Sequence, residues 1–317
     1  PPTSDEANVE VTLAANAGTD QSYCEATTAV NLEGTVSTAG TWSQDSGPNT
    51  ATITTTSANT AVASGLIPGV YVFRFTISTP GCSTTDVMTV TLYQPPTTAV
   101  AGPDQDLCDA AVLTLDGNVP AFGTGNWTKI AGPGAGSFVP DANTPDATYT
   151  GAQPGVYVFV WTISNGTCSS GDQVRIENSA SPTVSDAGPD QTQVCSDQAT
   201  MAANLPLIGV GNWTQISGPN TAGISSVILP NTTITGLIPG VYTFRWTISN
   251  GVICASSSDD VVITALLTPT PADAGADQSL CNQAATTMDA TILTIGTGLW
   301  TQVSGPNSAV FADATSP

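Results

Sequence analysis

The sequence predicts an all-β protein made of tandem β-sandwich repeats, and three observations lead to that prediction. A segment of the form Pro-Gly-Val-Tyr-x-Phe-x-(Trp/Phe)-Thr-Ile-Ser occurs at residues 68–78, 154–164 and 239–249. A Gly-x-Trp segment recurs at a nearly constant spacing, and the cysteines recur with nearly the same period. No stretch has the periodicity of a helix. A period of about 86 residues suits one small β-sandwich per repeat.

The Pro-Gly-Val-Tyr segment has the pattern of a core strand. In its first copy every second residue is large and apolar, from Tyr71 through Phe73 and Phe75 to Ile77. A period of two places these side chains on one face of a strand, and the Pro-Gly before it marks a turn. We therefore expect this to be the central strand of each sandwich. The tyrosines expected in the core are Tyr71, Tyr157 and Tyr242.

The remainder of each repeat reads as shorter strands that cover this central strand. An Ala-Gly-x-Asp-Gln segment leads to the first cysteine, and an alternating strand, the Gly-x-Trp strand and a Gly-Pro turn follow. The second cysteine and a last strand come after the Pro-Gly-Val-Tyr segment. Short strands bounded by Gly, Pro and Asn are typical of all-β domains. The tryptophans expected to pack in the core near a disulfide are Trp42, Trp127, Trp213 and Trp300.

The repeat landmarks predict five segments along the chain. They are the last strand of a preceding repeat (1–14), three complete repeats (15–98, 99–184 and 185–271) and the first half of a fourth repeat (272–317). Half a sandwich leaves a core face and a sheet edge open, so we expect either continuing chain or a strand of a neighbouring subunit to complete it. Short linkers with prolines favour an extended string of repeats.

The seven cysteines predict one disulfide per complete repeat. Two cysteines recur in each repeat at a nearly equal separation, and Cys281 is left with a partner expected outside the segment. The absence of histidine and of a Cys-x-x-Cys motif favours disulfides over zinc, with buried free thiols as the alternative. Disulfides place the protein in an oxidising compartment, outside the cytoplasm. The predicted pairs are Cys24–Cys82, Cys108–Cys168 and Cys195–Cys254.

Composition excludes several classes of function. Only 9% of the residues are charged, the net charge is −21 and four residues are basic, so there is no basic surface for nucleic acid or for an anionic membrane. No apolar run is long enough to suggest a transmembrane helix. Without histidine, only carboxylates could supply acid–base catalysis, and they sit at repeat-equivalent positions. That placement indicates an architectural role, and we expect no enzyme activity.

Calcium is the one cofactor that the sequence suggests. Aspartates recur in the Ala-Gly-x-Asp-Gln segments and after the second cysteine, and oxygen ligands clustered at a junction between repeats could bind Ca²⁺. The alternative is that these side chains cap turns and keep the surface soluble. The candidate calcium ligands are Asp104, Asp172, Asp186, Asp190, Asp259, Asp273 and Asp277.

The repeat motifs together resemble those of a known family. Ala-Gly-x-Asp-Gln-x-x-Cys, Gly-x-Trp-Thr-x-x-Ser-Gly-Pro and Gly-Leu-x-Pro-Gly-Val-Tyr-x-Phe-x-Trp-Thr-Ile-Ser-Asn-Gly-x-Cys resemble the PKD-like, immunoglobulin-like repeats of giant surface proteins in Bacteroidetes. That group includes gliding-motility adhesins exported by the type IX secretion system. The Trp-Asp-Phe-Gly-Asp-Gly motif of typical PKD domains is absent, and Gly-x-Trp-Thr stands in its place. The resemblance implies no functional residues beyond structural ones.

These observations predict a structural segment of a bacterial extracellular filament or adhesin stalk. Its expected partners are further repeats of the same chain or identical filament subunits, with surface polysaccharide as a candidate ligand. Two alternatives remain at the level of sequence: an array of carbohydrate-binding modules, with or without Ca²⁺, and a spacer of a secreted hydrolase.

Overall fold

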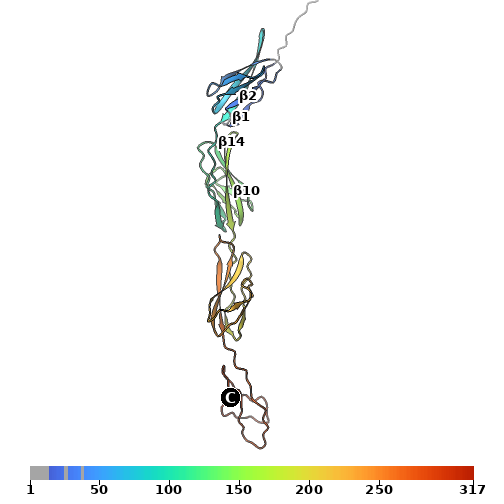
Figure 1. Cartoon of the computed structure of the whole chain (residues 1–317), viewed down its shortest axis with the longest axis vertical. Helices are drawn as coiled ribbons and strands as arrows, with labels where there is room; N and C mark the ends of the chain where they lie inside the picture. The colour runs from blue at the N-terminus through green and yellow to red at the C-terminus, as the bar shows by residue number, and fades with distance from the viewer. Residues whose placement is uncertain (1–13, 25–27, 37–38) are drawn as a thin grey trace, which may run out of the picture. The chain divides into compact units, whose positions relative to one another are not determined.

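The structure is a computed structural model that describes residues 14–24, 28–36 and 39–317. The strand predicted within residues 1–14 lies outside the described residues, apart from residue 14. The chain divides into two compact units, Pro1–Ser179 and Ala180–Pro317. The described part is made of strands and connecting segments without helices, which confirms the predicted all-β class (Figure 1). No segment of this described part is a helix suited to crossing a bilayer.

The first repeat is a sandwich of two sheets. A four-stranded sheet has the order β1-β7-β6-β3, and a three-stranded sheet has the order β2-β5-β4. The buried side chains of both sheets form a single apolar core. The strands are β1 (Gln21–Cys24), β2 (Ala29–Glu33), β3 (Thr41–Ser46), β4 (Thr52–Thr55), β5 (Thr60–Ser64), β6 (Gly69–Thr79) and β7 (Cys82–Tyr93).

The second repeat has the same arrangement. Its four-stranded sheet has the order β10-β13-β14-β8, and its three-stranded sheet has the order β11-β12-β9. It lies in the same compact unit as the first repeat. The strands are β8 (Gln105–Cys108), β9 (Val112–Thr114), β10 (Thr124–Ala131), β11 (Ser137–Val139), β12 (Thr148–Thr150), β13 (Gly155–Asn165) and β14 (Cys168–Ser179).

The third repeat, in the second unit, again consists of two sheets. The orders are β15-β21-β20-β17 and β16-β19-β18. The same topology in three repeats shows that the period of the sequence is a structural unit. The strands are β15 (Gln191–Val194), β16 (Gln198–Thr200), β17 (Val210–Ser217), β18 (Gly223–Ile224), β19 (Thr233–Thr235), β20 (Gly240–Ser249) and β21 (Ser257–Ala265).

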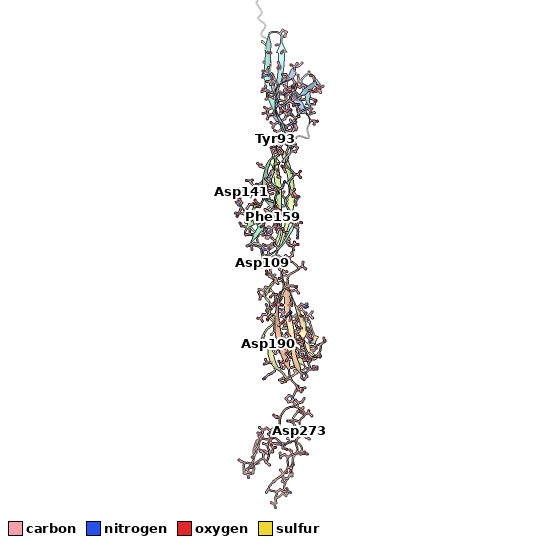
Figure 2. The ribbon with its side chains drawn as sticks, turned by 90° about the vertical axis from the view of Figure 1, so that its left-hand side faces the viewer. Tyr93, Asp109, Asp141, Phe159, Asp190 and Asp273 are labelled. Atoms are coloured by element: carbon pink, nitrogen blue, oxygen red, sulfur yellow. A yellow bond between two sulfur atoms is a disulfide. The ribbon has the colours of Figure 1, made fainter. Side chains whose placement is uncertain are left out.

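The Pro-Gly-Val-Tyr segment forms the central strand of each four-stranded sheet. In β13 the side chains of Tyr157, Phe159, Trp161 and Ile163 are all 0% exposed, while the alternate residues are half-buried or exposed. Phe159 is labelled in Figure 2. Burying each such side chain contributes about 1.5–3 kcal/mol relative to leaving it in water. The strand is the main apolar contribution of each repeat to its core. The tyrosines Tyr71, Tyr157 and Tyr242 are all fully buried.

A short parallel strand closes the edge of each four-stranded sheet. The Gln-x-x-Cys stretch of the first repeat forms β1, which pairs with the carboxyl end of β7 in the register Gln21↔Val90 to Cys24↔Tyr93. Strands β8 and β15 pair in parallel with β14 and β21 in the same way. This pairing fixes the position of the first cysteine, because it carries Cys24 and Cys108 to the end of their sheets where the next linker begins.

Residues 272–317 contain no strand. Their tryptophan, Trp300, is partly exposed, and its indole Nε1 donates a 2.9 Å hydrogen bond to the carbonyl oxygen of Ser316. In the second repeat the equivalent Trp127 packs against Trp161 of the central strand, with ring centroids 5.0 Å apart. Among the described residues no aromatic ring packs against Trp300, whereas Phe75, Trp161 and Trp246 pack against the equivalent tryptophans.

Candidate functional site: the junction between repeats

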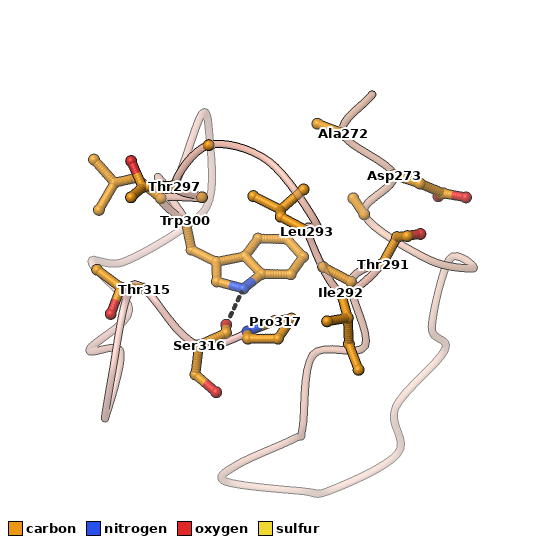
Figure 3. Close-up of a pocket in the computed structure, with 15 residues that line it drawn as sticks. Ala272, Asp273, Thr291, Ile292, Leu293, Thr297, Trp300, Thr315, Ser316 and Pro317 are labelled. Carbon is orange, nitrogen blue, oxygen red and sulfur yellow. Dashed lines mark hydrogen bonds between the residues drawn. The ribbon is translucent and has the colours of Figure 1, made fainter. Parts of the chain in front are cut away.

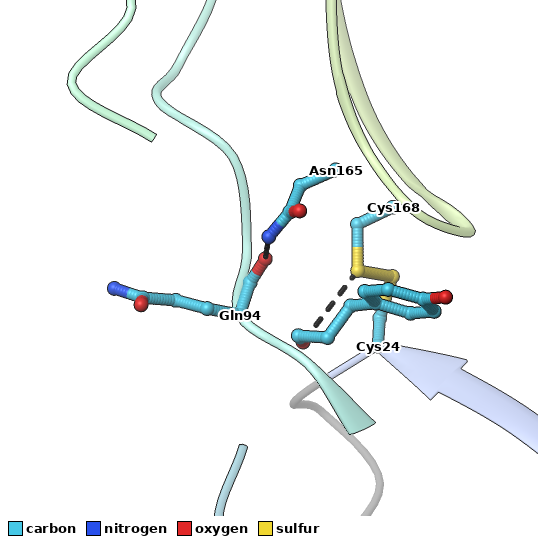
Figure 4. Close-up of a disulfide and its surroundings, with 5 residues drawn as sticks. Cys24, Gln94, Asn165 and Cys168 are labelled. Carbon is cyan, nitrogen blue, oxygen red and sulfur yellow. Dashed lines mark hydrogen bonds between the residues drawn. A yellow bond between two sulfur atoms is a disulfide. The ribbon is translucent and has the colours of Figure 1, made fainter. Parts of the chain in front are cut away.

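A disulfide joins consecutive repeats. Cys24, at the end of β1 in the first repeat, is bonded to Cys168, the first residue of β14 in the second, with their Cα atoms 5.5 Å apart (Figure 4). The bond connects positions 144 residues apart in the sequence. The predicted pairs Cys24–Cys82 and Cys108–Cys168 are therefore wrong. The covalent link runs between sandwiches and not across one.

The geometry of a single repeat explains why its two cysteines do not pair. Cys24 lies opposite Tyr93, the last residue of β7, whereas Cys82 is the first residue of that 12-residue strand. The two ends of such a strand are about 36 Å apart at roughly 3.3 Å per residue. Cysteine Cα atoms more than about 7 Å apart cannot form a disulfide without backbone movement. Cys24 therefore cannot reach Cys82.

The remaining cysteines divide into two groups. Cys108 and Cys254 are each disulfide-bonded. Cys82, Cys195 and Cys281 are free and exposed. The predicted pair Cys195–Cys254 is therefore also wrong, because one member is a free thiol and the other is oxidised. The expectation of an oxidising compartment still follows from the disulfides that the structure contains.

Polar and apolar contacts accompany the Cys24–Cys168 bond. The side-chain amide of Asn165, at the tip of the β13–β14 hairpin, donates a 2.8 Å hydrogen bond to the carbonyl oxygen of Gln94 in the linker (Figure 4). The Cys168 sulfur lies 3.7 Å from the carbonyl oxygen of Tyr93. The Tyr93 ring packs on the backbone of Gly166, where an added Cβ would lie 2.4 Å from ring atoms. The junction is therefore a packed contact, with the disulfide as one of its parts.

The third repeat carries the same linker contact. Asn250 lies in the hairpin between β20 and β21, and its side-chain amide donates a 2.8 Å hydrogen bond to the carbonyl oxygen of Ala180. Ala180 begins the segment that leads into this repeat, as Gln94 does for the second. The asparagine of the Asn-Gly hairpin therefore holds the linker that precedes its own repeat. The Asn-Gly dipeptides were apparent in the sequence, but nothing in the spacing indicated this contact.

The tryptophans of the three complete repeats pack on aromatic rings of the central strands. Trp127 packs on Trp161 one strand away, and its indole Nε1 donates a 2.9 Å hydrogen bond to the carbonyl oxygen of Pro145. The glycine two residues before it, Gly125, leaves room for the neighbouring ring, because an added Cβ would lie 2.1 Å from Trp161. Close approach thus explains the Gly-x-Trp motif. Trp127 and Trp213 are 1% exposed, while Trp42 and Trp300 are partly exposed.

The recurrent tyrosine clamps the turn that precedes the central strand. The Tyr157 hydroxyl accepts a 2.7 Å hydrogen bond from the backbone N–H of Gln153 and donates a 3.0 Å bond to its carbonyl oxygen. Tyr71 and Tyr242 bond in the same way to the residue four positions upstream. A tyrosine hydroxyl that bonds to the backbone a few residues upstream is a hallmark of immunoglobulin-like sandwiches, where it is known as a tyrosine corner.

Four of the candidate calcium ligands instead hold the edge strand in place. Asp172, on β14, accepts a 2.8 Å hydrogen bond from the backbone N–H of Ala101. Asp104, in the Ala-Gly-x-Asp-Gln segment, accepts a 2.8 Å bond from the backbone N–H of Arg175 on β14. The two aspartates thus hold the Ala-Gly-x-Asp-Gln segment against β14, because Asp172 of the strand binds the segment and Asp104 of the segment binds the strand. In the third repeat the same roles belong to Asp259 and Asp190.

The other candidates also bond locally. Asp186 and Asp273 accept hydrogen bonds from the backbone N–H groups of Gly188 and Gly275, two residues further along. Among the described residues, no three cysteine or acidic side chains gather so that they could hold a metal ion, and Asp277 is no exception. Asp186 and Asp273 thus fit the turn-capping alternative, whereas Asp104, Asp172, Asp190 and Asp259 bond to backbone groups far away in the sequence.

The three arginines pair with carboxylates on the outer face of the sheets. Arg245, on β20, binds Asp260 on β21 through two hydrogen bonds of 2.7 and 2.8 Å. This hydrogen bonding lowers the pKa of Asp260 below its usual value and raises that of Arg245. Both side chains are substantially exposed, so the pair contributes little to stability. The other pairs are Arg74–Asp45 and Arg175–Glu177.

One cavity lies in the half-repeat at residues 272–317. It has a volume of about 660 Å³ and is lined by Trp300, Leu293, Ile292 and neighbouring residues (Figure 3). Trp300 forms one wall, beside the carbonyl of Ser316 to which it donates (Figure 3). In the complete repeats, rings of the central strand pack against the equivalent tryptophan. The lining of the cavity is mostly apolar or small, and Asp273 is the one ionisable side chain in it.

Comparison with known proteins links the first repeat to a domain family. Residues 17–92 match the family model described as "K319L-like, PKD domain". The mouse (Mus musculus) dyslexia-associated protein KIAA0319 homolog is 30% identical over 220 residues, which are 62% of this chain and 20% of that protein. The chain thus spans a fifth of the length of the curated relatives that it matches.

The solved structures that match this chain include tandem immunoglobulin domains and a PKD domain. Titin domains I67–I69, in an E-to-A mutated variant, align over 81% of this chain and 100% of that one, with 14% identity and a TM-score of 0.42. The solution structure of the PKD domain from the KIAA 1837 protein aligns over 26% of this chain and 86% of that one, with 31% identity and a TM-score of 0.24. With the sheet topology above, the chain is a tandem series of immunoglobulin-like and PKD-like β-sandwiches, and its first repeat matches the K319L-like PKD domain.

Proposed function

We propose that this chain is a structural segment of an extracellular or cell-surface protein, in which the sandwiches form a stalk or filament that supports adhesion. The observation that carries the proposal is the disulfide between Cys24 and Cys168. A bond between consecutive repeats limits how far two sandwiches can separate or rotate. Such a limit serves a load-bearing spacer, and it has no evident use in a chain of independent ligand-binding modules.

The roles of the recurrent polar residues support the same proposal. The aspartates, tyrosines and asparagines that repeat along the chain bond to backbone groups of their own sandwich or its linker. Side chains used in this way hold the architecture together and are not free to act on a substrate. We therefore propose no catalytic role for this segment.

We also propose the kind of organism and surface structure to which the stalk belongs. The motif resemblance to surface repeats of Bacteroidetes supports a bacterial adhesin or filament, of the kind used in gliding motility and exported by type IX secretion. The curated relatives come from mouse and rat. The proposed partners are further repeats of the same chain or identical filament subunits. Surface polysaccharide is the proposed ligand of an adhesive part.

Electron microscopy of the intact protein on its cells, or shed from them, tests the proposal. A thin fibre with one bead per repeat is the expected result. A compact particle in which a few beads flank a larger globular domain would contradict it and make the segment a spacer of another activity. Comparing samples with and without reducing agent adds a second readout, since reduction should loosen the spacing of neighbouring beads.

A further inference from the structure

The two cysteine positions of each repeat are structurally equivalent along the chain. We use "first cysteine" for the one that follows the Ala-Gly-x-Asp-Gln segment and "second cysteine" for the one that begins the last strand. The first cysteines are Cys24, Cys108, Cys195 and Cys281, and the second cysteines are Cys82, Cys168 and Cys254. The observed bond joins the first cysteine of one repeat to the second cysteine of the next.

The free second cysteine has the backbone position of its bonded equivalent. Cys82 pairs in register with Thr79 across the β6–β7 hairpin, just as Cys168 pairs with Asn165 across the β13–β14 hairpin. The bonded second cysteines are covered, with Cys168 3% and Cys254 5% exposed, whereas Cys82 is exposed. Cys82 thus has the same position in its hairpin as Cys168, but it lacks the contact with another repeat that buries Cys168.

The free first cysteine of the third repeat is also placed like its bonded equivalent. Cys195 directly follows Val194, which pairs with Ala265 at the end of β21. Cys24 has the same relation to the end of β7, where it lies opposite Tyr93. The thiol of Cys195 is exposed at the end of the sheet from which the next linker leaves.

We propose that Cys82 and Cys195 are connector sites, each of which forms a disulfide with a cysteine of another repeat of this type. Cys82 accepts a first cysteine, and Cys195 accepts a second cysteine. The observed bond joins a first cysteine to the second cysteine of the following repeat, and Cys82 and Cys195 are a free, exposed second cysteine and first cysteine. The partner is a β-sandwich whose cysteine lies in a hairpin or edge strand like those seen here. The inference deepens the proposed stalk function and rests on it, because the same linkage extends a series of repeats.

The bond forms by thiol–disulfide exchange with a small-molecule disulfide such as oxidised glutathione. The thiolate of Cys195 attacks one glutathione sulfur, forms a mixed disulfide and releases one reduced glutathione. The thiolate of Cys82 on a second copy then attacks the Cys195 sulfur and releases the second reduced glutathione. Two thiols are oxidised, and one glutathione disulfide is reduced.

Two single substitutions of the full chain test the pairing rule between copies. In Cys281→Ser two cysteines stay free: Cys82, a second cysteine, and Cys195, a first cysteine. The matched control, Cys82→Ser, leaves Cys195 and Cys281 free, which are two first cysteines. Both variants keep two exposed thiols, and retention of the Cys24–Cys168 peptide in both would show that they fold alike.

In a glutathione redox buffer the Cys281→Ser chains should become linked through Cys82–Cys195, at least about tenfold more than the control, because docking raises the local thiol concentration. Non-reducing electrophoresis and peptide mapping measure the extent and identity of the links. Equal linking in both variants, links only between like cysteines, or no linking in either variant would overturn the proposal. These results would leave the stalk function untouched, since microscopy of the intact protein tests that separately.

Discussion

The Cys24–Cys168 disulfide should shorten the fully stretched chain by a length that can be worked out from its position. A pulling force applied to the two ends passes through the bond and bypasses the chain between its cysteines, which are 144 positions apart in the sequence. At roughly 3.3–3.6 Å per extended residue, a segment of this size holds about 500 Å of chain that cannot extend while the bond is intact. The first sandwich and most of the second are therefore shielded from the load.

Single-molecule force spectroscopy measures this length directly. The test chain keeps Cys24 and Cys168 as its only cysteines, and the control carries Cys24→Ser in addition. Under oxidising conditions the test chain should reach full extension about 500 Å before the control, because its bypassed segment stays folded out of the load path. Reducing agent should abolish the difference. Equal lengths under oxidising conditions would refute the link between repeats.

Three further predictions follow from the core, the tyrosine clamp and the surface ion pairs. Gly125→Ala should destabilise the second repeat by about 1–3 kcal/mol in urea unfolding, because the added methyl overlaps the Trp161 ring; an unchanged midpoint would show that the close approach is not required. Tyr157→Phe should cost about 0.5–1.5 kcal/mol in thermal or urea unfolding, because the part-buried hydrogen bond from the Gln153 backbone N–H loses its acceptor. A stability equal to wild type would contradict a stabilising role for this hydroxyl. Hydrogen bonding to Arg245 lowers the pKa of Asp260 in the folded protein. The ion pair therefore stabilises the folded state at pH values above the pKa of an aspartate in the unfolded chain. This stabilisation is lost as the pH falls through the lowered pKa of the folded state. Asp260→Asn should therefore lower the urea midpoint slightly at neutral pH and have the same midpoint as wild type in strong acid. A difference between the two midpoints that persists in acid would contradict a stabilising ion pair.

The architecture of each sandwich was predictable because its determinants are local. Alternation along residues 154–164 places four large side chains on one face wherever that strand lies, and they form the buried face of β13. Glycine and proline around it set the turns. The Gly-x-Trp motif also indicated a core tryptophan, although only the packed structure shows that Gly125 makes room for the Trp161 ring.

The role of the recurrent aspartates could not be predicted in the same way. The sequence presents Asp104 and Asp172 as acids at repeating positions, which suits both a calcium site and a structural clamp. The choice depends on what faces each carboxylate after folding, and the nearest groups are backbone N–H donors. Hydrogen-bond partners so far apart in the sequence are a product of strand pairing, and no local pattern encodes them.

The sequence by itself determined the all-β class, the repeat period, the core strand and the presence of disulfides in a chain with one cysteine pair per repeat. Only the tertiary structure decided which cysteines pair. Nearly equal spacings suggested a bond within each repeat, yet the parallel strand β1 carries Cys24 to one end of the sheet and the β6–β7 hairpin carries Cys82 to the other. A disulfide requires two Cα atoms within a few ångströms, so the direction of one short edge strand assigns the bond to the neighbouring sandwich.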